Sequence, residues 1–221
     1  MPLTLPDIEK VAALCAPKWD RYYTKAKLKS DPVYAAIEDD LRGSTLPVLD
    51  IGCGIGLLTH WLRGSGIELP TVGIDFDERK IVAADHMAQG MSGVRYITGD
   101  ARTDLPEHQG SVVILDVLQY FPAEEQDELL RAATRRVAPG GRLLIRSGLS
   151  GGSWRYDLTR ACDWLAKLTF WMKASPVVYP NAEQFHRVLE AEGLSVAITP
   201  LWGRTPFYNH LIRAERPAVP A

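Results

Sequence analysis

The sequence predicts an α/β fold with three layers, in which helices cover both faces of a mostly parallel sheet. Three observations predict it. From residue 46 onward, short apolar runs alternate with amphipathic helical segments, and a glycine-rich turn joins the first run to the first helix. Two further strand-like runs separated by a turn end the chain, whereas helical spacing of apolar residues dominates before residue 46.

The first 45 residues predict three helices. Apolar or aromatic residues recur at helical spacing over 8–15 and again over 19–26. The third segment, 31–43, has its own start signals, with Asp31 as the cap and Pro32 at the first helical position. These segments predict an all-helical extension in front of the sheet.

Five apolar runs of strand length follow, and they are 47–51, 71–75, 94–98, 112–116 and 142–146. Runs that are apolar on both faces are typical of parallel strands covered on both sides. Asp77 can cap one intervening helix, and Pro122 can open another. A helix is predicted over 182–192, and the runs 194–201 and 207–214 predict a final antiparallel hairpin.

Length and composition limit the classes of protein. The 221 residues suffice for one domain, and 46% hydrophobic with 24% charged residues is typical of a soluble globular protein. A formal charge of −2 disfavours a nucleic-acid partner. The three cysteines form no CxxC pair, which favours neither zinc nor disulfides and fits a reducing cytoplasm. We see no signal peptide and no run of about 18 apolar residues that could span a membrane.

The strongest local signal is the stretch Val48-Leu-Asp-Ile-Gly-Cys-Gly-Ile-Gly56. Its glycines let the backbone turn sharply and let a ligand approach, while the following helix offers free N–H groups; a plain strand–helix turn is the alternative. The spacing G-x-G-x-G differs from the dinucleotide fingerprint G-x-G-x-x-G. Asp50, just before the turn, would repel a pyrophosphate and favour a cationic amine.

Two more acids follow neighbouring strands. Asp75 ends the second predicted strand and Asp100 follows the third. Asp75 can accept hydrogen bonds from ribose hydroxyls, or it can share a helix cap with Asp77. Asp100 can accept from an adenine amino group, or it can be an ordinary turn residue. Because parallel strands end at one edge of the sheet, the acids at 50, 75 and 100 are expected at one crevice.

Five motifs in this order resemble the class I S-adenosylmethionine-dependent methyltransferases: the glycine stretch, Gly-Ile-Asp75, Gly-Asp100-Ala, Leu-Asp116-Val-Leu-Gln-Tyr and Ala-Pro139-Gly-Gly-Arg-Leu. The resemblance covers roughly residues 46–148. It implies a three-layer α/β/α sandwich with a seven-stranded, mostly parallel sheet and an antiparallel last strand.

The same resemblance implies one methyltransferase domain over 1–221. Its parts would be N-terminal helices at 1–45, a cofactor-binding core at 46–148, a substrate-side insertion at 149–180, and a helix with the terminal hairpin at 181–221.

The resemblance also implies that S-adenosyl-L-methionine is the cofactor and S-adenosyl-L-homocysteine the product. The residues it implies for binding are Asp50, Gly52, Cys53, Gly54, Gly56, Asp75, Phe76, Asp100, Ala101 and Asp116. The glycine turn would hold the methionine moiety, Asp75 the ribose, and Phe76 one face of the adenine. Asp100 and Ala101 would lie at the adenine edge, and Asp116 beside the sulfonium. Acids and the absence of a phosphate-binding lysine suit this cationic ligand.

The substrate should approach between the N-terminal helices and the segments after the fourth and fifth strands. The candidates for contacting it are Tyr22, Gln119, Tyr120, Arg146, Trp154 and Tyr156. Arg146 is either a substrate anchor or the partner of a cleft acid. The aromatic stripe Trp19, Tyr22 and Tyr23 is expected in the core, with substrate contact as the alternative.

The apolar insertion admits two interpretations. Residues 154–172 either cover the site as a packed helix, or form an apolar lid or a surface that meets a lipid or a carrier protein. The catalytic group stays open, with Asp116, Tyr120 and Arg146 as candidates. No metal is expected, because the five histidines do not pair at ligand spacing.

The predicted function is methyl transfer from S-adenosyl-L-methionine to a small, hydrophobic, aromatic or carrier-linked acceptor by in-line displacement. Whether oxygen, nitrogen or carbon is methylated stays open, as does the oligomeric state. The alternatives are a non-catalytic cofactor-binding partner subunit with the same fold, which would not need the acids, and a nicotinamide oxidoreductase, which the glycine spacing disfavours.

Overall fold

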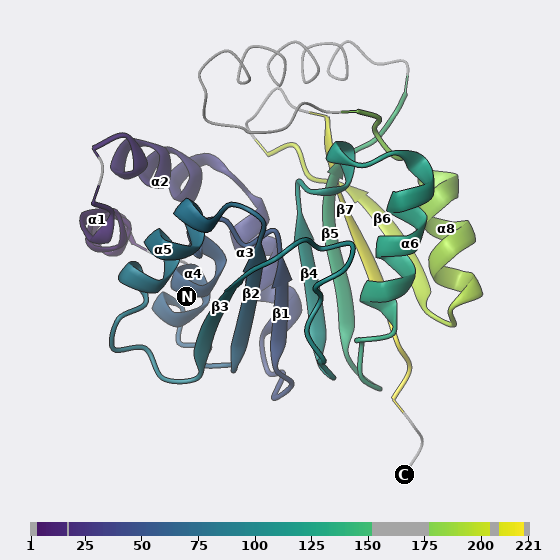
Figure 1. Cartoon of the computed structure of the whole chain (residues 1–221), viewed down its shortest axis with the longest axis horizontal. Coiled ribbons are helices and arrows are strands. Elements are labelled where there is room, and N and C mark those ends of the chain that lie inside the picture. Colours follow the sequence, from purple (N-terminus) through teal and green to yellow (C-terminus); the bar gives the residue numbers. More distant parts are fainter. Residues whose placement is uncertain (1–3, 17, 152–176, 204–207, 219–221) are drawn as a thin grey trace. The chain divides into compact units, whose positions relative to one another are not determined.

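The computed structural model describes residues 4–16, 18–151, 177–203 and 208–218 (Figure 1). The chain divides into two compact units, residues 1–106 and 107–221. Trp154, Tyr156 and the apolar stretch 154–172 lie outside the described residues.

The first unit combines the N-terminal helices with three strands. The elements are α1 (Leu5–Leu14), α2 (Lys18–Ser30), α3 (Val33–Leu41), β1 (Val48–Ile51), α4 (Leu57–Gly64), β2 (Thr71–Asp75), α5 (Glu78–Met87) and β3 (Val94–Thr98). The strands are parallel in the order β3-β2-β1, with Asp50 opposite Gly73 and Gly73 opposite Tyr96. The three predicted N-terminal helices, the helix after the glycine turn, the helix capped by Asp77 and the three predicted strands are therefore present.

Within residues 107–151, 177–203 and 208–218, the second unit has four strands and three short helices. Its elements are β4 (Ser111–Leu115), the 3₁₀ helix η1 (Leu118–Tyr120), α6 (Ala123–Thr134), β5 (Arg142–Gly148), α8 (Ala182–Ala191), β6 (Ser195–Pro200) and β7 (Asn209–Glu215). β4 and β5 are parallel, and β7 lies antiparallel between β5 and β6. The two units contribute the seven strands and the reversed final strand that the sequence predicts.

Side-chain caps fix several helix starts where the sequence places them. The Asp77 carboxylate accepts from the Arg79 N–H at 3.1 Å before α5, and the Asn181 side chain accepts from the Gln184 N–H at 2.8 Å before α8. The third helix begins one residue later than predicted, because Pro32 is its cap residue and Asp31 accepts from the Val33 N–H. Such caps satisfy N–H groups that have no partner inside the helix.

The aromatic stripe of α2 does not face the core. Thr24 and Leu28 are the buried residues of this helix, whereas Trp19 is 58% and Tyr22 71% exposed. The Thr24 hydroxyl lies 3.3 Å from the Cys15 sulfur at the end of α1, so the side of α2 that carries Thr24 is the side that packs. The core interpretation of Trp19 and Tyr22 is therefore wrong.

A buried tyrosine lies beneath the glycine turn. A Cβ atom placed at Gly73 would lie 2.6 Å from the Tyr96 ring, and one placed at Gly56 would overlap the Tyr96 hydroxyl. A Cβ at Gly54 would instead meet nothing within 4 Å. Gly56 and Gly73 thus make room for the Tyr96 ring, whereas the space beside Gly54 is open.

We predict that Gly73→Ala destabilises the protein through the Tyr96 ring. The new methyl would also lie 2.8 Å from the Cys53 sulfur, and overpacking of this kind lowers the free energy of unfolding by about 1–3 kcal/mol. Urea denaturation measures the loss. In a Tyr96→Leu background the same change should cost clearly less; an equal cost in both backgrounds would mean that the ring is not what Gly73 accommodates.

Candidate functional site

The glycine turn between β1 and α4 is held by the end of β2. The N–H groups of Gly52 and Cys53 both donate to the carbonyl of Ile74, at 2.7 and 3.1 Å. Gly52, Gly54 and Gly56 have φ angles of 78°, 56° and 78°. Positive φ favours glycine, so the backbone geometry itself requires this residue type. The open side of Gly54 leaves its backbone within reach of a ligand.

Asp75 joins the turn to the start of α5. One carboxylate oxygen accepts from the Gly54 N–H at 3.0 Å and the other from the Asp77 N–H at 2.9 Å. The side chain is buried, and Asp77 rather than Asp75 caps the helix. A carboxylate has about four acceptor positions, so Asp75 keeps lone pairs with which to bind hydroxyl groups.

Asp50 is a buried acid on β1 without a cationic partner. Among the described residues, no hydrogen bond or ion pair reaches its carboxylate, and the residue is 2% exposed. Burial, together with the negative charge of Asp75, raises the pKa of Asp50 to about 7. A buried carboxylate without a partner is costly, and a strongly shifted pKa is typical of functional sites. Asp50 is thus suited to a cationic group that a ligand brings.

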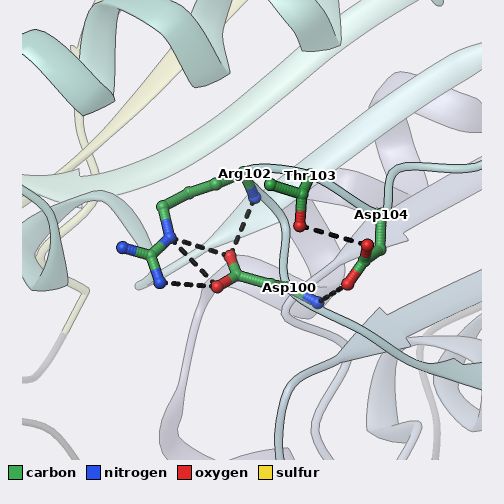
Figure 2. A network of polar contacts seen from close by, with 4 residues as sticks. All are labelled: Asp100, Arg102, Thr103 and Asp104. Carbon is green, nitrogen blue, oxygen red and sulfur yellow. Dashed lines mark hydrogen bonds and ion pairs between the residues drawn. The ribbon is translucent and has the colours of Figure 1, made fainter.

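The carboxylate of Asp100, which follows β3, already accepts hydrogen bonds from the neighbouring Arg102 (Figure 2). Its carboxylate accepts from the Arg102 backbone N–H at 2.9 Å, from Nε at 3.0 Å and from Nη2 at 2.6 Å. The Asp100 N–H in turn donates to Asp104 at 2.8 Å, and Thr103 donates to the other Asp104 oxygen. The Arg102 hydrogen bonds lower the pKa of Asp100. An adenine amino group would have to share this carboxylate with Arg102.

The other predicted cofactor-binding residues of this unit, Phe76, Cys53 and Ala101, differ in how exposed their side chains are. The Phe76 ring is 54% exposed beside Asp75, as a stacking surface would require. The Cys53 side chain packs in a cluster with Ile81, Ala84 and Tyr96, and burial raises the pKa of the thiol well above its usual range. Only the backbone of Cys53 therefore faces the turn. Ala101 is partly exposed.

In the second unit, Arg146 is paired with an acid. Its guanidinium forms an ion pair with Asp116, and the Arg146 carbonyl accepts from the Asp116 N–H at 3.1 Å. The Arg146 side chain is only 5% exposed, whereas that of Asp116 is 34% exposed. Of the two sequence interpretations of Arg146, the structure thus contains the ion pair. Asp116 has a φ of 58°, a conformation that aspartate adopts more readily than most residues.

The other described substrate candidates belong to η1 and α2. Gln119 is buried in η1 and its carbonyl accepts from the Val177 N–H at 2.7 Å, while Tyr120 ends η1 partly exposed. Tyr22 projects from α2, in the first unit. Sequence reasoning missed Tyr96, although Gly73 within a strand pattern was a signal, since glycine there often marks a close approach.

The described residues contain neither a cluster of metal ligands nor a helix that could span a membrane. No cluster of three or more histidine, cysteine, aspartate or glutamate side chains that could hold a metal ion occurs among the described residues. None of the helices described is both long and apolar enough to cross a membrane.

Comparison with known families identifies the region of the glycine turn and the acids. Residues 48–141 match a family described as "Methyltransferase domain". This segment is a class I S-adenosylmethionine-dependent methyltransferase domain. The family and fold class predicted from the motifs are therefore confirmed, and S-adenosylmethionine is the cofactor of that family.

Curated relatives of the methyltransferase domain are named O-methyltransferases. The chain is 32% identical over 147 residues to a ubiquinone biosynthesis O-methyltransferase of Pseudomonas savastanoi pv. phaseolicola, a match to 63% of this chain and 61% of the relative. It is 27% identical over 197 residues to the demethylspheroidene O-methyltransferase of Rhodobacter capsulatus, covering 86% and 48%. The chain thus spans about three fifths or less of these relatives.

Solved structures share the fold of the methyltransferase domain. Magnesium protoporphyrin IX methyltransferase from Synechocystis, solved with bound S-adenosylhomocysteine, aligns with a TM-score of 0.63 at 22% identity, covering 83% of this chain and 80% of that one. An O-methyltransferase family protein from Burkholderia thailandensis aligns with a TM-score of 0.68 at 19% identity, covering 91% and 60%. At these identities the likeness establishes the fold alone.

We predict that Arg102→Ala strengthens binding of S-adenosylhomocysteine. The change frees the Asp100 carboxylate for the adenine amino group, and an exposed pair of this kind is worth up to about 1 kcal/mol, or about two- to fivefold in affinity. Titration calorimetry measures it. Arg95→Ala, at an exposed position of β3, removes the same charge elsewhere in the unit and should leave affinity unchanged. Weaker binding by Arg102→Ala would place Arg102 among the binding groups instead.

Proposed function

We propose that this chain transfers a methyl group from S-adenosylmethionine to an oxygen atom of a small aromatic or apolar acceptor. One observation carries the proposal: buried acids, one of them without a partner among the described residues, surround an open glycine turn in the first unit. The curated relatives, which are named O-methyltransferases, support oxygen as the methylated atom.

The donor set fits a ligand with an amine, a ribose and an adenine. Asp50 would pair with the amine, because it is a buried acid that no cationic side chain of the described residues contacts. Asp75 would accept from the ribose hydroxyls while continuing to hold Gly54. Phe76 would stack on the adenine, and Asp100 would accept from its amino group. When bound, the cofactor supplies an activated methyl group on a sulfonium.

Methyl transfer asks little covalent chemistry of the protein. The acceptor atom, the methyl carbon and the sulfur must be in line and shielded from water, which positioning residues provide. A base is needed only if the acceptor must lose a proton. Asp116 is paired with Arg146, so this ion pair is better suited to holding the backbone at the end of β4 than to accepting a proton.

Binding of S-adenosylhomocysteine tests the first half of the proposal. We expect calorimetry to show a one-to-one complex, and Asp75→Ala to weaken it about ten- to hundredfold through the loss of charge-assisted hydrogen bonds, about 1.5–3 kcal/mol. Asp85→Ala, at an exposed position of α5, is the matched control and should bind normally. No measurable complex with the unaltered protein would overturn the proposed function. Unchanged affinity in Asp75→Ala would reject only the role of Asp75.

Proton release on binding tests Asp50 separately. Its pKa of about 7 means that part of the unliganded protein carries a proton there, and a bound cation favours the ionised form. We therefore expect proton release on binding, and affinity that rises about tenfold between about pH 5.5 and 7.5. Calorimetry in two buffers of different ionisation enthalpy counts the protons.

Asp50→Asn is the matched variant for this effect. It should bind more weakly and lose both the proton release and the pH dependence below pH 7. In the unliganded protein the raised pKa of Asp50 costs stability progressively as pH rises from about 4 to 7, so Asp50→Asn should also flatten that decline. The same proton release in Asp50→Asn would show that another group titrates.

A further inference from the structure

The side of α2 that faces away from the first unit carries aromatic and basic residues. Successive side chains on a helix are about 100° apart, so the buried residues Thr24 and Leu28 mark the packed side of α2. The opposite side is exposed at five positions, which we call the outer face of α2: Lys18, Trp19, Tyr22, Ala26 and Lys29. Both its aromatic and its basic residues bear on what this face can bind.

The aromatic residues of the outer face are neighbours. Trp19 and Tyr22 are three positions apart and therefore lie on the same side of the helix. Together with Leu14, the last residue of α1, they account for three of the five large hydrophobic side chains that are exposed among the described residues of the first unit. α1 packs beside α2 in this unit (Figure 1). Isolated exposed apolar side chains are normal, whereas neighbouring ones indicate an interaction surface.

The outer face of α2 is also positively charged. Five of the 13 residues of α2 are lysine or arginine and one, Asp20, is acidic and partly buried, although the whole chain carries a net charge of −2. Lys25 forms an ion pair with Glu9 of α1. No described residue forms an ion pair with Lys18 or Lys29. These two ammonium groups therefore remain available to an anionic partner.

A lipid surface is the anionic partner that suits both kinds of residue. Tryptophan and tyrosine are enriched where a bilayer meets water, because their rings combine an apolar body with a polar group. Lysine can lay its apolar stem along that boundary and keep its ammonium beside lipid phosphates. A second copy of the chain fits poorly, since a two-fold contact would bring two positive faces together. Nucleic acid is disfavoured by the net charge of −2.

We propose that the outer face of α2 docks this protein on a membrane surface that contains anionic phospholipid. Trp19 and Tyr22 enter between the lipid headgroups, and Lys18 and Lys29 lie beside the phosphates. Because α2 extends only about 20 Å, it lies along the bilayer and does not cross it. α2 also contacts α4, the helix that follows the glycine turn, so docking holds this part of the first unit at the lipid surface. The inference goes beyond the proposed function and does not depend on it.

Sedimentation with vesicles tests the docking. We expect the unaltered protein to pellet with vesicles of equal parts phosphatidylcholine and phosphatidylglycerol, and to stay in solution with phosphatidylcholine alone. Added salt should weaken the binding, because it screens the attraction between lysine and phosphate. Absence of binding to the anionic vesicles, or equal binding to both kinds, would overturn the proposal. So would a protein that binds duplex DNA, or that pairs with itself through this face, without binding the vesicles.

Two charge-reversed variants show whether this face or the net charge governs binding. Lys18→Glu combined with Lys29→Glu reverses the charge of the outer face. Arg95→Glu combined with Arg135→Glu makes the same change in net charge at exposed positions on β3 and after α6. We expect the first variant to bind anionic vesicles at least about tenfold more weakly, and the second to bind within about threefold of normal. Equal losses in both would reject the outer face as the docking surface.

Removal of the aromatic side chains tests their entry into the lipid. Trp19→Ser combined with Tyr22→Ser should weaken vesicle binding at least about tenfold. Its melting temperature should be unchanged, because both side chains are exposed in the free protein. Val82→Ser, which changes an exposed apolar residue of α5, is the matched control and should bind normally. Normal binding by the aromatic double variant contradicts the proposal.

Fluorescence quenching locates the contact on the chain. Anionic vesicles with brominated acyl chains quench those tryptophans that reach the boundary of the hydrocarbon, and the sequence has six tryptophans. Trp19→Phe keeps an aromatic ring on the outer face and removes one fluorophore. We expect this variant to bind vesicles nearly as well as the unaltered protein and to lose most of the quenching. Quenching that persists in full would place the contact on another surface and reject the assignment to α2.

Discussion

The first unit depends on the two backbone hydrogen bonds that the carboxylate of Asp75 accepts. One holds the N–H of Gly54 in the glycine turn, and the other holds the N–H of Asp77 ahead of α5. A single buried side chain at the end of β2 thus fixes two backbone segments that follow different strands. Because the carbonyl of Ile74 accepts two further N–H groups of the same turn, β2 sets the shape of the turn from two consecutive residues. The glycine turn therefore presents a backbone surface whose shape is held by the end of β2.

Three of the predicted cofactor-binding acids illustrate three electrostatic states. Asp50 is buried with its pKa raised to about 7, Asp100 is partly exposed with its pKa lowered by Arg102, and Asp116 is paired with Arg146. A cationic group of a ligand would be stabilised most beside Asp50, because pairing there removes the cost of a buried carboxylate without a partner. Beside Asp100 it would compete with Arg102. Net charge, which is −2 for the whole chain, reveals none of these differences.

The order of elements could be predicted from the sequence because it rests on local signals. Strand runs, caps such as Asp77 and Asn181, and the glycine turn each act within a few residues. The acids at the ends of β1 and β2 could also be placed, since parallel strands bring their ends to one edge. The residues on which prediction failed depend on how elements pack against each other. The side of α2 that packs carries Thr24, which contacts Cys15, the residue that follows α1.

Inside the site, prediction also missed one local and one long-range contact. The pairing of Arg102 with Asp100 depends on the geometry of the turn after β3. The accommodation of Tyr96 by Gly56 depends on how β3 packs beside the turn. The motif therefore predicted a sharp glycine turn, but it could not distinguish Gly54, which has open space beside it, from Gly56, whose space the Tyr96 ring fills.

The packing of Tyr96 has a consequence for how this sequence can diverge. The ring excludes a side chain at Gly56 and at Gly73 together, although these glycines belong to different elements. In related proteins a large aromatic residue at this position of β3 should occur only where both glycines occur, and a residue larger than glycine at either should accompany a smaller one on β3. Substitutions at these three positions should therefore occur together. At Gly56 a left-handed backbone, with a φ of 78°, also favours glycine, whereas Gly73 has no such backbone constraint.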